Sequence, residues 1–278
     1  MQLAFSTLGC PEWTLARILE VARREGFAGI EFHGLLGSLD LAQAPEFTSA
    51  HIAETRAQLR AAGVQAACLA CDMPLMSAVG DEVDRRQALS TVEAYLDMAK
   101  AVDAPFVRIP CGALPVTLLP AEVTERAINV LRLLGDFAQA RGVTLLLDTR
   151  DAFTDSRVLE ELLRLTRHRA IRALWDLEST YRQAGESPAQ TIAHLGTEIR
   201  YVLLKDSVLN ADGEQVTLVP VGTGELPIDA ALHALRAQGY ASFLTLEWEK
   251  RTHPELSELD VVLPHFRDQV QGWLAKAA

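Results

Sequence analysis

Short apolar runs alternate with amphipathic stretches along the whole chain. In stretches such as residues 15–22 and 123–137, apolar side chains recur every three or four positions, which predicts helices with one buried face. Four such stretches pass through a glycine into an apolar run, at EGFAGIEF, AAGVQAAC, ARGVTLLL and AQGYASFL. This order is typical of a helix, a glycine that ends it and a following strand, so we predict βα units throughout.

The apolar runs with strand character number eight: LAFST, GIEF, VQAACLA, FVRI, VTLLLD, IRALWD, IRYVLLKD and FLTLEWE. Eight βα units in 278 residues predict an α/β fold, a (β/α)8 TIM barrel, as one domain over residues 1–278. A doubly wound sheet is the alternative. The first turn, STLGCPEW, lacks the glycine-rich phosphate-binding pattern that such a sheet often carries, which favours the barrel.

Charged residues stand at the ends of these predicted strands, where a barrel carries its active site. Side chains two apart on a strand share a face, so in FLTLEWE the apolar Leu244, Leu246 and Trp248 should face the helices. Glu247 and Glu249 should then face inward. The same phase on the other strands predicts these further inward side chains: Glu31, His33, Arg108, Asp148, Arg150, Asp176, Glu178, Leu203 and Lys205.

Carboxylates that converge in this way repel one another, and they need a cation, Lys or Arg neighbours or raised pKa values to coexist. One acidic strand end is often the start of a solvated loop. Charged ends on five strands favour a functional site.

The amino-acid composition and charge narrow the kinds of molecule that the protein is expected to bind. The net charge of −11 and a pI of about 5.1 argue against nucleic-acid binding, which needs a basic face. The first residues contain neither a basic segment nor a long apolar stretch, so we expect no signal peptide, no membrane association and a cytoplasmic location. Cys68 and Cys71 form a lone CxxC that we interpret as small buried side chains. We expect a small-molecule partner.

Seven segments resemble the xylose isomerase-like TIM barrels of the sugar phosphate isomerase/epimerase superfamily, over nearly the whole chain. They are STLGCPEW, GFAGIEF, LLLDTRDAFTDS, WDLESTYRQAGESP, YVLLKDS, VGTGELP and FLTLEWEKRTHPEL. The resemblance implies a divalent metal. Its family ligands are a Glu ending strand five, an Asp of a Trp-Asp pair on strand six, a His on strand seven and a Glu ending strand eight.

Carried onto this chain, those four positions are Asp148, Asp176, Leu203 and Glu247. Asp148 keeps a carboxylate but is one methylene shorter, and Leu203 has no lone pair to donate. The resemblance therefore implies a divergent metal site, and two alternatives stay open. In the first, Asp148, Asp176 and Glu247 bind Mn²⁺ or Mg²⁺ with weakened affinity, because oxygen ligands suit those ions.

In the second alternative, Arg108, Arg150 and Lys205 neutralise the carboxylates and no metal is bound. The mouth then binds an anionic metabolite or has lost its chemistry.

The resemblance also implies an isomerase or epimerase that moves a proton beside the carbonyl of a sugar or keto acid, with Asp148 and Glu247 as the catalytic pair. We predict substrate contacts from Glu31, His33, Arg108, Arg150, Glu178, Lys205 and Glu249. A homo-oligomer is left open. The DNA-repair endonuclease branch of the superfamily is disfavoured, because only seven histidines are present and few stand at strand ends.

Overall fold

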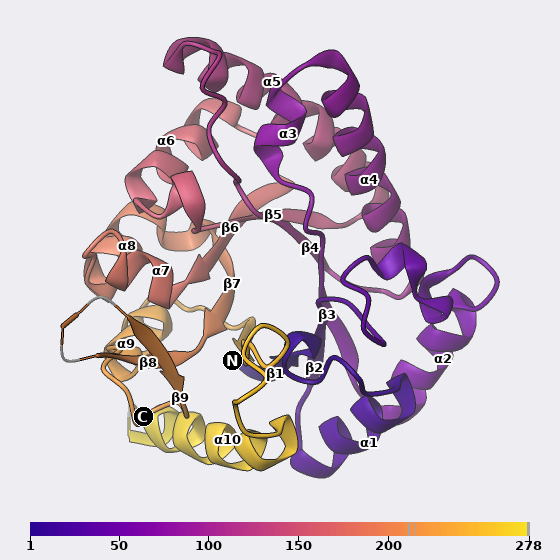
Figure 1. The fold of residues 1–278 in the computed structure, drawn as a ribbon, viewed down its shortest axis with the longest axis vertical. Coiled ribbons are helices and arrows are strands. Elements are labelled where there is room, and N and C mark those ends of the chain that lie inside the picture. The colour runs from indigo at the N-terminus through magenta and orange to yellow at the C-terminus, as the bar shows by residue number, and fades with distance from the viewer. Residues whose placement is uncertain (211, 214, 277–278) are drawn as a thin grey trace.

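Eight parallel strands close on themselves in the order β1, β10, β7, β6, β5, β4, β3 and β2 (Figure 1). The computed structural model describes residues 1–210, 212–213 and 215–276. The barrel strands are β1 (Gln2–Ser6), β2 (Gly29–Phe32), β3 (Gln65–Ala70), β4 (Phe106–Ile109), β5 (Thr144–Asp148), β6 (Ile171–Asp176), β7 (Ile199–Leu204) and β10 (Phe243–Leu246). The closed parallel barrel confirms the predicted fold.

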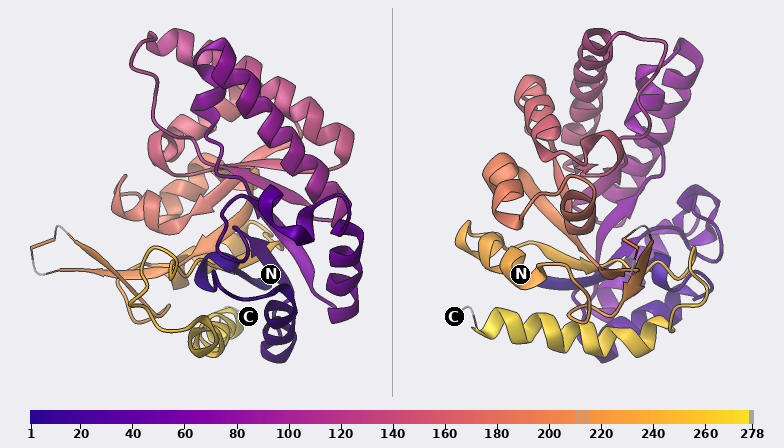
Figure 2. Two further views of the ribbon diagram at one scale, coloured as in Figure 1. Left: turned by 45° about the vertical axis from the view of Figure 1, so that its right-hand side comes forward. Right: turned by 60° about the vertical axis from the view of Figure 1, so that its left-hand side comes forward.

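Helices surround the barrel and cover its outer face (Figures 1 and 2). The longer ones are α1 (Leu15–Glu25), α2 (Ile52–Ala62), α4 (Glu82–Ala101), α5 (Pro120–Arg141), α6 (Ser156–Thr166), α8 (Pro188–Leu195), α9 (Ile228–Ala237) and α10 (Leu259–Lys276). Two short helices, α3 (Leu75–Val79) and α7 (Leu177–Arg182), follow strands β3 and β6. None of the described helices has the length and apolar character needed to cross a bilayer.

The four glycines of the predicted helix–glycine–strand pattern have positive φ angles: Gly26 75°, Gly63 68°, Gly142 72° and Gly239 75°. A side chain with a Cβ rarely adopts this left-handed conformation, which is why glycine ends these helices. The local sequence pattern thus sets where each helix ends and the chain turns into the next strand.

Alternation along the strands divides the buried side chains between two environments. On β5, Leu145 and Leu147 pack outward against the helices, whereas Leu146 and Asp148 point into the barrel. Apolar side chains fill the lower interior of the barrel: Ala4, Ala67, Cys68, Leu146, Leu174, Tyr201, Leu203 and Phe243. Because this layer closes the barrel below, polar chemistry is confined to the mouth at the carboxyl ends of the strands.

A two-stranded antiparallel hairpin, β8 (Asp206–Leu209) and β9 (Val216–Val219), follows β7 and projects away from the barrel (Figure 2). The sequence analysis did not predict it. The signal was present, because Asp212-Gly213 lies between two runs of alternating residues. The predicted strand seven, IRYVLLKD, ends at Asp206, where β8 begins.

All four cysteines are free and buried, which agrees with the interpretation of Cys68 and Cys71 as small core side chains.

Substitution of an interior leucine tests the barrel packing. Leu146→Ala should lower the free energy of unfolding by about 2–5 kcal/mol, because it leaves a cavity inside the barrel. Val261→Ala, at an exposed position of α10, is the control and should change stability by less than about 0.5 kcal/mol. Urea denaturation measures both. Equal effects for the two variants would contradict the interior placement of Leu146.

Candidate active site

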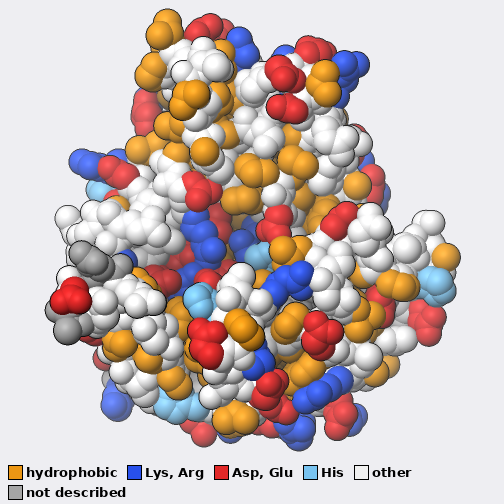
Figure 3. All heavy atoms as spheres, viewed as in Figure 1, with side chains coloured by type: hydrophobic (Ala, Val, Ile, Leu, Met, Phe, Trp, Pro, Cys, Tyr) orange, Lys and Arg blue, Asp and Glu red, His pale blue; other side chains and the backbone are white. Residues whose placement is uncertain are grey.

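Acidic, basic and histidine side chains gather in the hollow at the centre of the barrel mouth (Figure 3). Ten side chains form this mouth cluster: Glu31, His33, Arg108, Asp148, Arg150, Asp176, Glu178, Lys205, Glu247 and Glu249. All ten were predicted to face inward, and the structure brings them together. Their roles in binding and catalysis remain predictions.

The segment DTRD, residues 148–151, sets the arrangement at the end of β5. Asp148 is fully buried at the last strand position, and the Thr149 hydroxyl accepts a hydrogen bond from the backbone N–H of Asp176 at 2.9 Å. Asp151 accepts one from the backbone N–H of Gly112 at 2.8 Å, which ties the loop to the end of β4. Arg150 can therefore turn its side chain back over the mouth.

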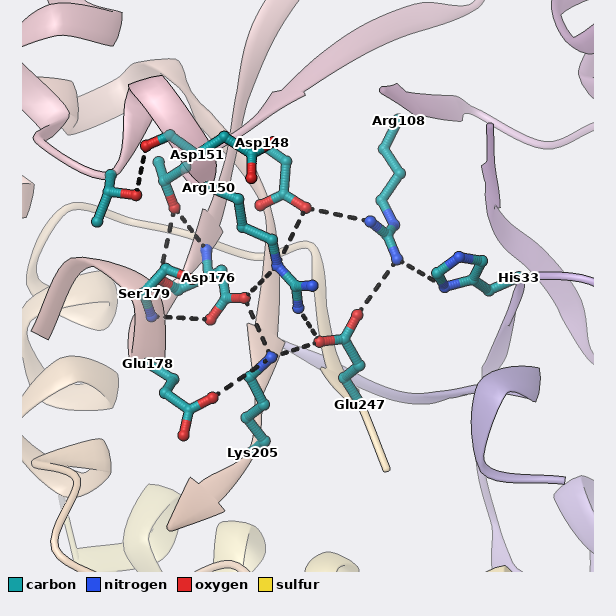
Figure 4. Close-up of polar contacts among 12 residues, drawn as sticks. His33, Arg108, Asp148, Arg150, Asp151, Asp176, Glu178, Ser179, Lys205 and Glu247 are labelled. Atoms are coloured by element: carbon teal, nitrogen blue, oxygen red, sulfur yellow. Dashed lines mark hydrogen bonds and ion pairs between the residues drawn. The ribbon is translucent and has the colours of Figure 1, made fainter. Parts of the chain in front are cut away.

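Arg150 contacts all three carboxylates that were predicted as metal ligands (Figure 4). Its Nε donates to Asp176 Oδ2 at 2.6 Å and lies 3.6 Å from Asp148 Oδ2, while Nη2 donates to Glu247. Asp148, Asp176 and Glu247 come from three different strands and are fully buried. One guanidinium thus neutralises groups that would otherwise repel one another.

Arg108 lies deeper, on β4, and is almost fully buried. Its Nη1 donates to Asp148 at 3.1 Å, and its Nη2 donates to Glu31 and Glu247, each at 3.2 Å. Nη2 also lies 2.9 Å from His33 Nδ1. A charged guanidinium only donates, so His33 Nδ1 accepts and carries no proton.

The other ring nitrogen of His33, Nε2, lies 2.9 Å from Asp72 Oδ1. The side chain of Asp72 is partly exposed and was not among the predicted site residues. It lies two residues after the end of β3, so the rule that selected the other strand ends would have found it.

Lys205, just after β7, is the third cation of the mouth cluster and is buried. Its Nζ lies 2.7 Å from Glu247, 2.8 Å from Glu249 and 3.3 Å from Asp176. Glu178, at the start of α7, lies 3.5 Å away. The three cations of the mouth cluster therefore contact six carboxylates, and the balance of formal charge is negative.

The next residue, Asp206, has a structural role. Its carboxylate accepts hydrogen bonds from the backbone N–H groups of Gly222, Gly224 and Leu226 at 2.8, 3.0 and 3.1 Å. A Cβ on Gly224 would lie 2.2 Å from Asp206 Oδ1, which explains the glycine in the GTGELP segment.

The mouth cluster has a buried part and a part that reaches solvent. Side-chain exposure is 28% for Arg150, 21% for Glu249, 15% for Glu178 and 10% for His33. The remaining members are nearly or fully buried. A ligand approaching from solvent therefore meets the four exposed side chains first.

The buried carboxylates differ in protonation. Burial raises the pKa of Asp148 to about 7, against the lowering effect of Arg150 and Arg108. Burial also opposes ionisation of Asp176 and Glu247, but the neighbouring cations outweigh it and bring both pKa values below the ordinary range. After burial itself, Lys205 and then Arg150 have the largest influence on the pKa of Asp176, and Arg150 has the largest on that of Glu247.

The structure also allows a test of whether the mouth fits a divalent metal. The predicted ligands Asp148, Asp176 and Glu247 all hold Arg150, and the fourth position, Leu203, packs in the apolar interior. In the described part of the chain, the group with ligand atoms within 4.8 Å of one another is Glu31, His33 and Glu247. Arg108 Nη2 contacts each of these three. The residues as placed do not fit a metal, because a guanidinium already lies at each position.

A closed parallel barrel with a charged mouth defines the class of protein, and sequence comparison gives the family. Residues 19–268 match the xylose isomerase-like TIM barrel family, and the chain belongs to it.

Among curated proteins, the chain is similar to fructoselysine 3-epimerase of Escherichia coli O157:H7, with 25% identity over 179 residues. The match spans 63% of this chain and 63% of that protein, so less than two thirds of its length.

Among solved structures, L-ribulose 3-epimerase superposes with a TM-score of 0.81 at 17% identity, covering 99% of this chain and 95% of that one. The IOLI protein, whose structure contains a zinc atom, gives 0.81 at 16% identity and covers 100% and 99%. At these identities the likeness shows the fold.

The raised pKa of Asp148 gives a pH test of stability. From the ordinary value of 3.8 up to about 7, folding takes up a proton at Asp148, so its contribution to stability falls as pH rises through that range. Asp176 and Glu247 have the opposite sign, because their lowered pKa values make stability fall on acidification below the ordinary carboxyl range.

Asp148→Asn should therefore gain stability relative to wild type as pH rises from roughly 4.5 to 8. Urea unfolding at a series of pH values measures this difference. Parallel curves for the two proteins would show that Asp148 does not titrate in this range.

Proposed function

We propose that the protein is a sugar epimerase or isomerase that acts on a small neutral polyhydroxy or keto compound at the barrel mouth. Family membership supports this reaction class, and two of the three relatives named above are 3-epimerases by name. The observation that carries the proposal is the mouth cluster itself. Its hydrogen-bond donors and carboxylates, set at the carboxyl ends of the strands, suit hydroxyl and carbonyl oxygens.

The charge balance favours a neutral ligand over an anionic one. The three cations contact six carboxylates, so the mouth has a negative balance of charge. Arg108 and Lys205 are almost fully buried, which leaves Arg150 as the exposed cation of the cluster. These observations count against the alternative in which Arg108, Arg150 and Lys205 bind an anionic metabolite.

The side chains that reach solvent are the first to meet a ligand. Arg150 offers donors to a carbonyl or hydroxyl oxygen, and Glu178 and Glu249 accept hydrogen bonds from neighbouring hydroxyl groups. His33 Nε2–H is shared with Asp72 at the edge of the mouth. We propose that these groups orient the sugar, whereas the buried carboxylates hold the two arginines and Lys205.

The reaction we propose is proton transfer beside the carbonyl. A carboxylate takes the C–H proton, the C–H electron pair forms a carbon–carbon double bond, and the carbonyl π electrons move onto oxygen. A protonated carboxyl group then returns a proton to the opposite face and regenerates the carbonyl. We assign the first step to Glu249, because Asp148 and Glu247, the predicted catalytic pair, lie beneath Arg150. The pair's own role stays a prediction.

Solvent deuterium exchange tests this function. The protein should catalyse incorporation of deuterium from D₂O at the carbon beside the carbonyl of at least one compound in a panel of ketopentoses, ketohexoses and fructoselysine, followed by proton NMR. Glu249→Gln should lower the exchange rate by about 10²–10⁴-fold, the range for loss of an acid–base group.

Glu255→Gln, an exposed carboxylate outside the mouth, is the matched control and should retain the wild-type rate. If Glu249→Gln is as active as wild type while Glu247→Gln or Asp148→Asn is inactive, the predicted pair performs the chemistry and our assignment is wrong. Absence of exchange with every compound in the panel would contradict the proposed function.

A further inference from the structure

Two positions in the mouth gather ligand atoms from several strands, and an arginine lies at each. At the deeper position Glu31, His33 and Glu247 bring their ligand atoms within 4.8 Å of one another, as a metal site would. Arg108 Nη2 lies 3.2, 2.9 and 3.2 Å from those three residues. A single guanidinium nitrogen therefore contacts the whole set.

Arg150 lies at the second position, among Asp148, Asp176 and Glu247. These are the three oxygen ligands that the family resemblance implies. The planar guanidinium directs Nε to Asp176 and Nη2 to Glu247, so one side chain bridges two carboxylates. Leu203, at the position of the family's histidine, lies in the apolar interior and offers no donor atom.

The electrostatics oppose a divalent ion beside these arginines. An ion at either position would meet a positive guanidinium at contact distance, and like charges repel strongly where water is excluded. Moving Arg108 aside would leave Glu31 without its cation in a fully buried environment. The buried carboxylates and the two arginines thus hold one another in place through their ion pairs.

We propose that Arg108 and Arg150 permanently fill the two cation positions of the mouth, so that this protein binds and converts its substrate without a divalent metal. Arg150 acts as the cation that polarises the substrate carbonyl. Of its guanidinium nitrogens, Nε and Nη2 make hydrogen bonds within the described part of the chain, and Nη1 makes none there (Figure 4). Nη1 belongs to the most exposed side chain of the cluster and is the donor available to a carbonyl oxygen.

The chemical part of this inference rests on the proposed function. When a carboxylate removes the proton beside the carbonyl, negative charge develops on the carbonyl oxygen. Arg150 Nη1–H donates a hydrogen bond to that oxygen without losing its own proton, because the neighbouring carboxylates hold the pKa of Arg150 well above its ordinary value despite burial. The oxygen gives up the charge when the carbon is reprotonated, so the guanidinium leaves the cycle unchanged.

Measurements of metal binding test, independently of any activity, the proposal that the arginines exclude a divalent metal from the mouth. Untagged protein, purified without chelator and then equilibrated with Mn²⁺ or Zn²⁺, should carry a substoichiometric amount of either metal by elemental analysis, and of Mn²⁺ also by electron paramagnetic resonance. Arg150→Met should bind Mn²⁺ at least about a hundredfold more tightly, because it removes a contacting positive charge and leaves three carboxylates. Arg150→Lys keeps the charge and should resemble wild type.

Arg141→Met is the matched control. Arg141 pairs with Glu93 and Asp97 on the surface, so its loss also uncovers carboxylates but away from the mouth, and it should not raise the affinity for Mn²⁺. If Arg150→Met fails to fold, wild type alone decides the question. One tightly bound metal per wild-type chain, removed by chelator with a fall in melting temperature, would overturn the proposal.

Exchange assays separate the two proposals. Chelator should leave wild-type deuterium exchange unchanged, and Arg150→Lys should lower kcat more than it raises KM, because the contact to oxygen strengthens in the transition state. If neither deuterium exchange nor bound metal is detected, the proposed function is wrong, and the proposal that the mouth binds no metal is supported. Exchange that is lost with chelator and restored by Mn²⁺ would support the function and refute the role of Arg150.

Discussion

The contacts of Arg150 with carboxylates at the ends of three strands, hydrogen bonds to Asp176 and Glu247 and an ion pair with Asp148, are the interaction on which the rest of the mouth depends. Asp148, Asp176 and Glu247 are fully buried, and the neighbouring cations keep Asp176 and Glu247 ionised against burial, whereas the pKa of Asp148 stays raised. Removing one partner from a buried ion pair costs about 3–5 kcal/mol, so the arginine and its carboxylates secure one another.

Closure of the barrel brings these carboxylates together, so their negative charges need cations nearby. β4, β5, β6 and β7 are neighbours in the sheet, and β10 follows β7, so their inward side chains converge at one end. The apolar layer beneath, which includes Leu146, Leu174 and Leu203, keeps water out from below. Charges at the mouth are solvated from one side, and the deeper carboxylates depend on Arg108, Arg150 and Lys205.

Sequence periodicity predicted which side chains meet, because alternation on a strand fixes the inward face once one apolar face is known. Periodicity could not predict how deeply each side chain is buried. Whether Glu247 reaches solvent depends on how the long side chain of Arg150 folds back, which is a matter of side-chain rotamers and of the loop tied by Asp151. The hairpin of β8 and β9 and the contact of Asp72 with His33 were missed, although turn residues and a strand-end position signalled them.

A crystal structure of the protein crystallised with Mn²⁺, with diffraction measured at the manganese absorption edge, shows directly whether an arginine or a metal occupies the mouth. We expect electron density for the Arg150 guanidinium between Asp176 and Glu247, and no anomalous peak in the mouth. An anomalous peak between Asp148, Asp176 and Glu247, with Arg150 turned out to solvent, would contradict this expectation.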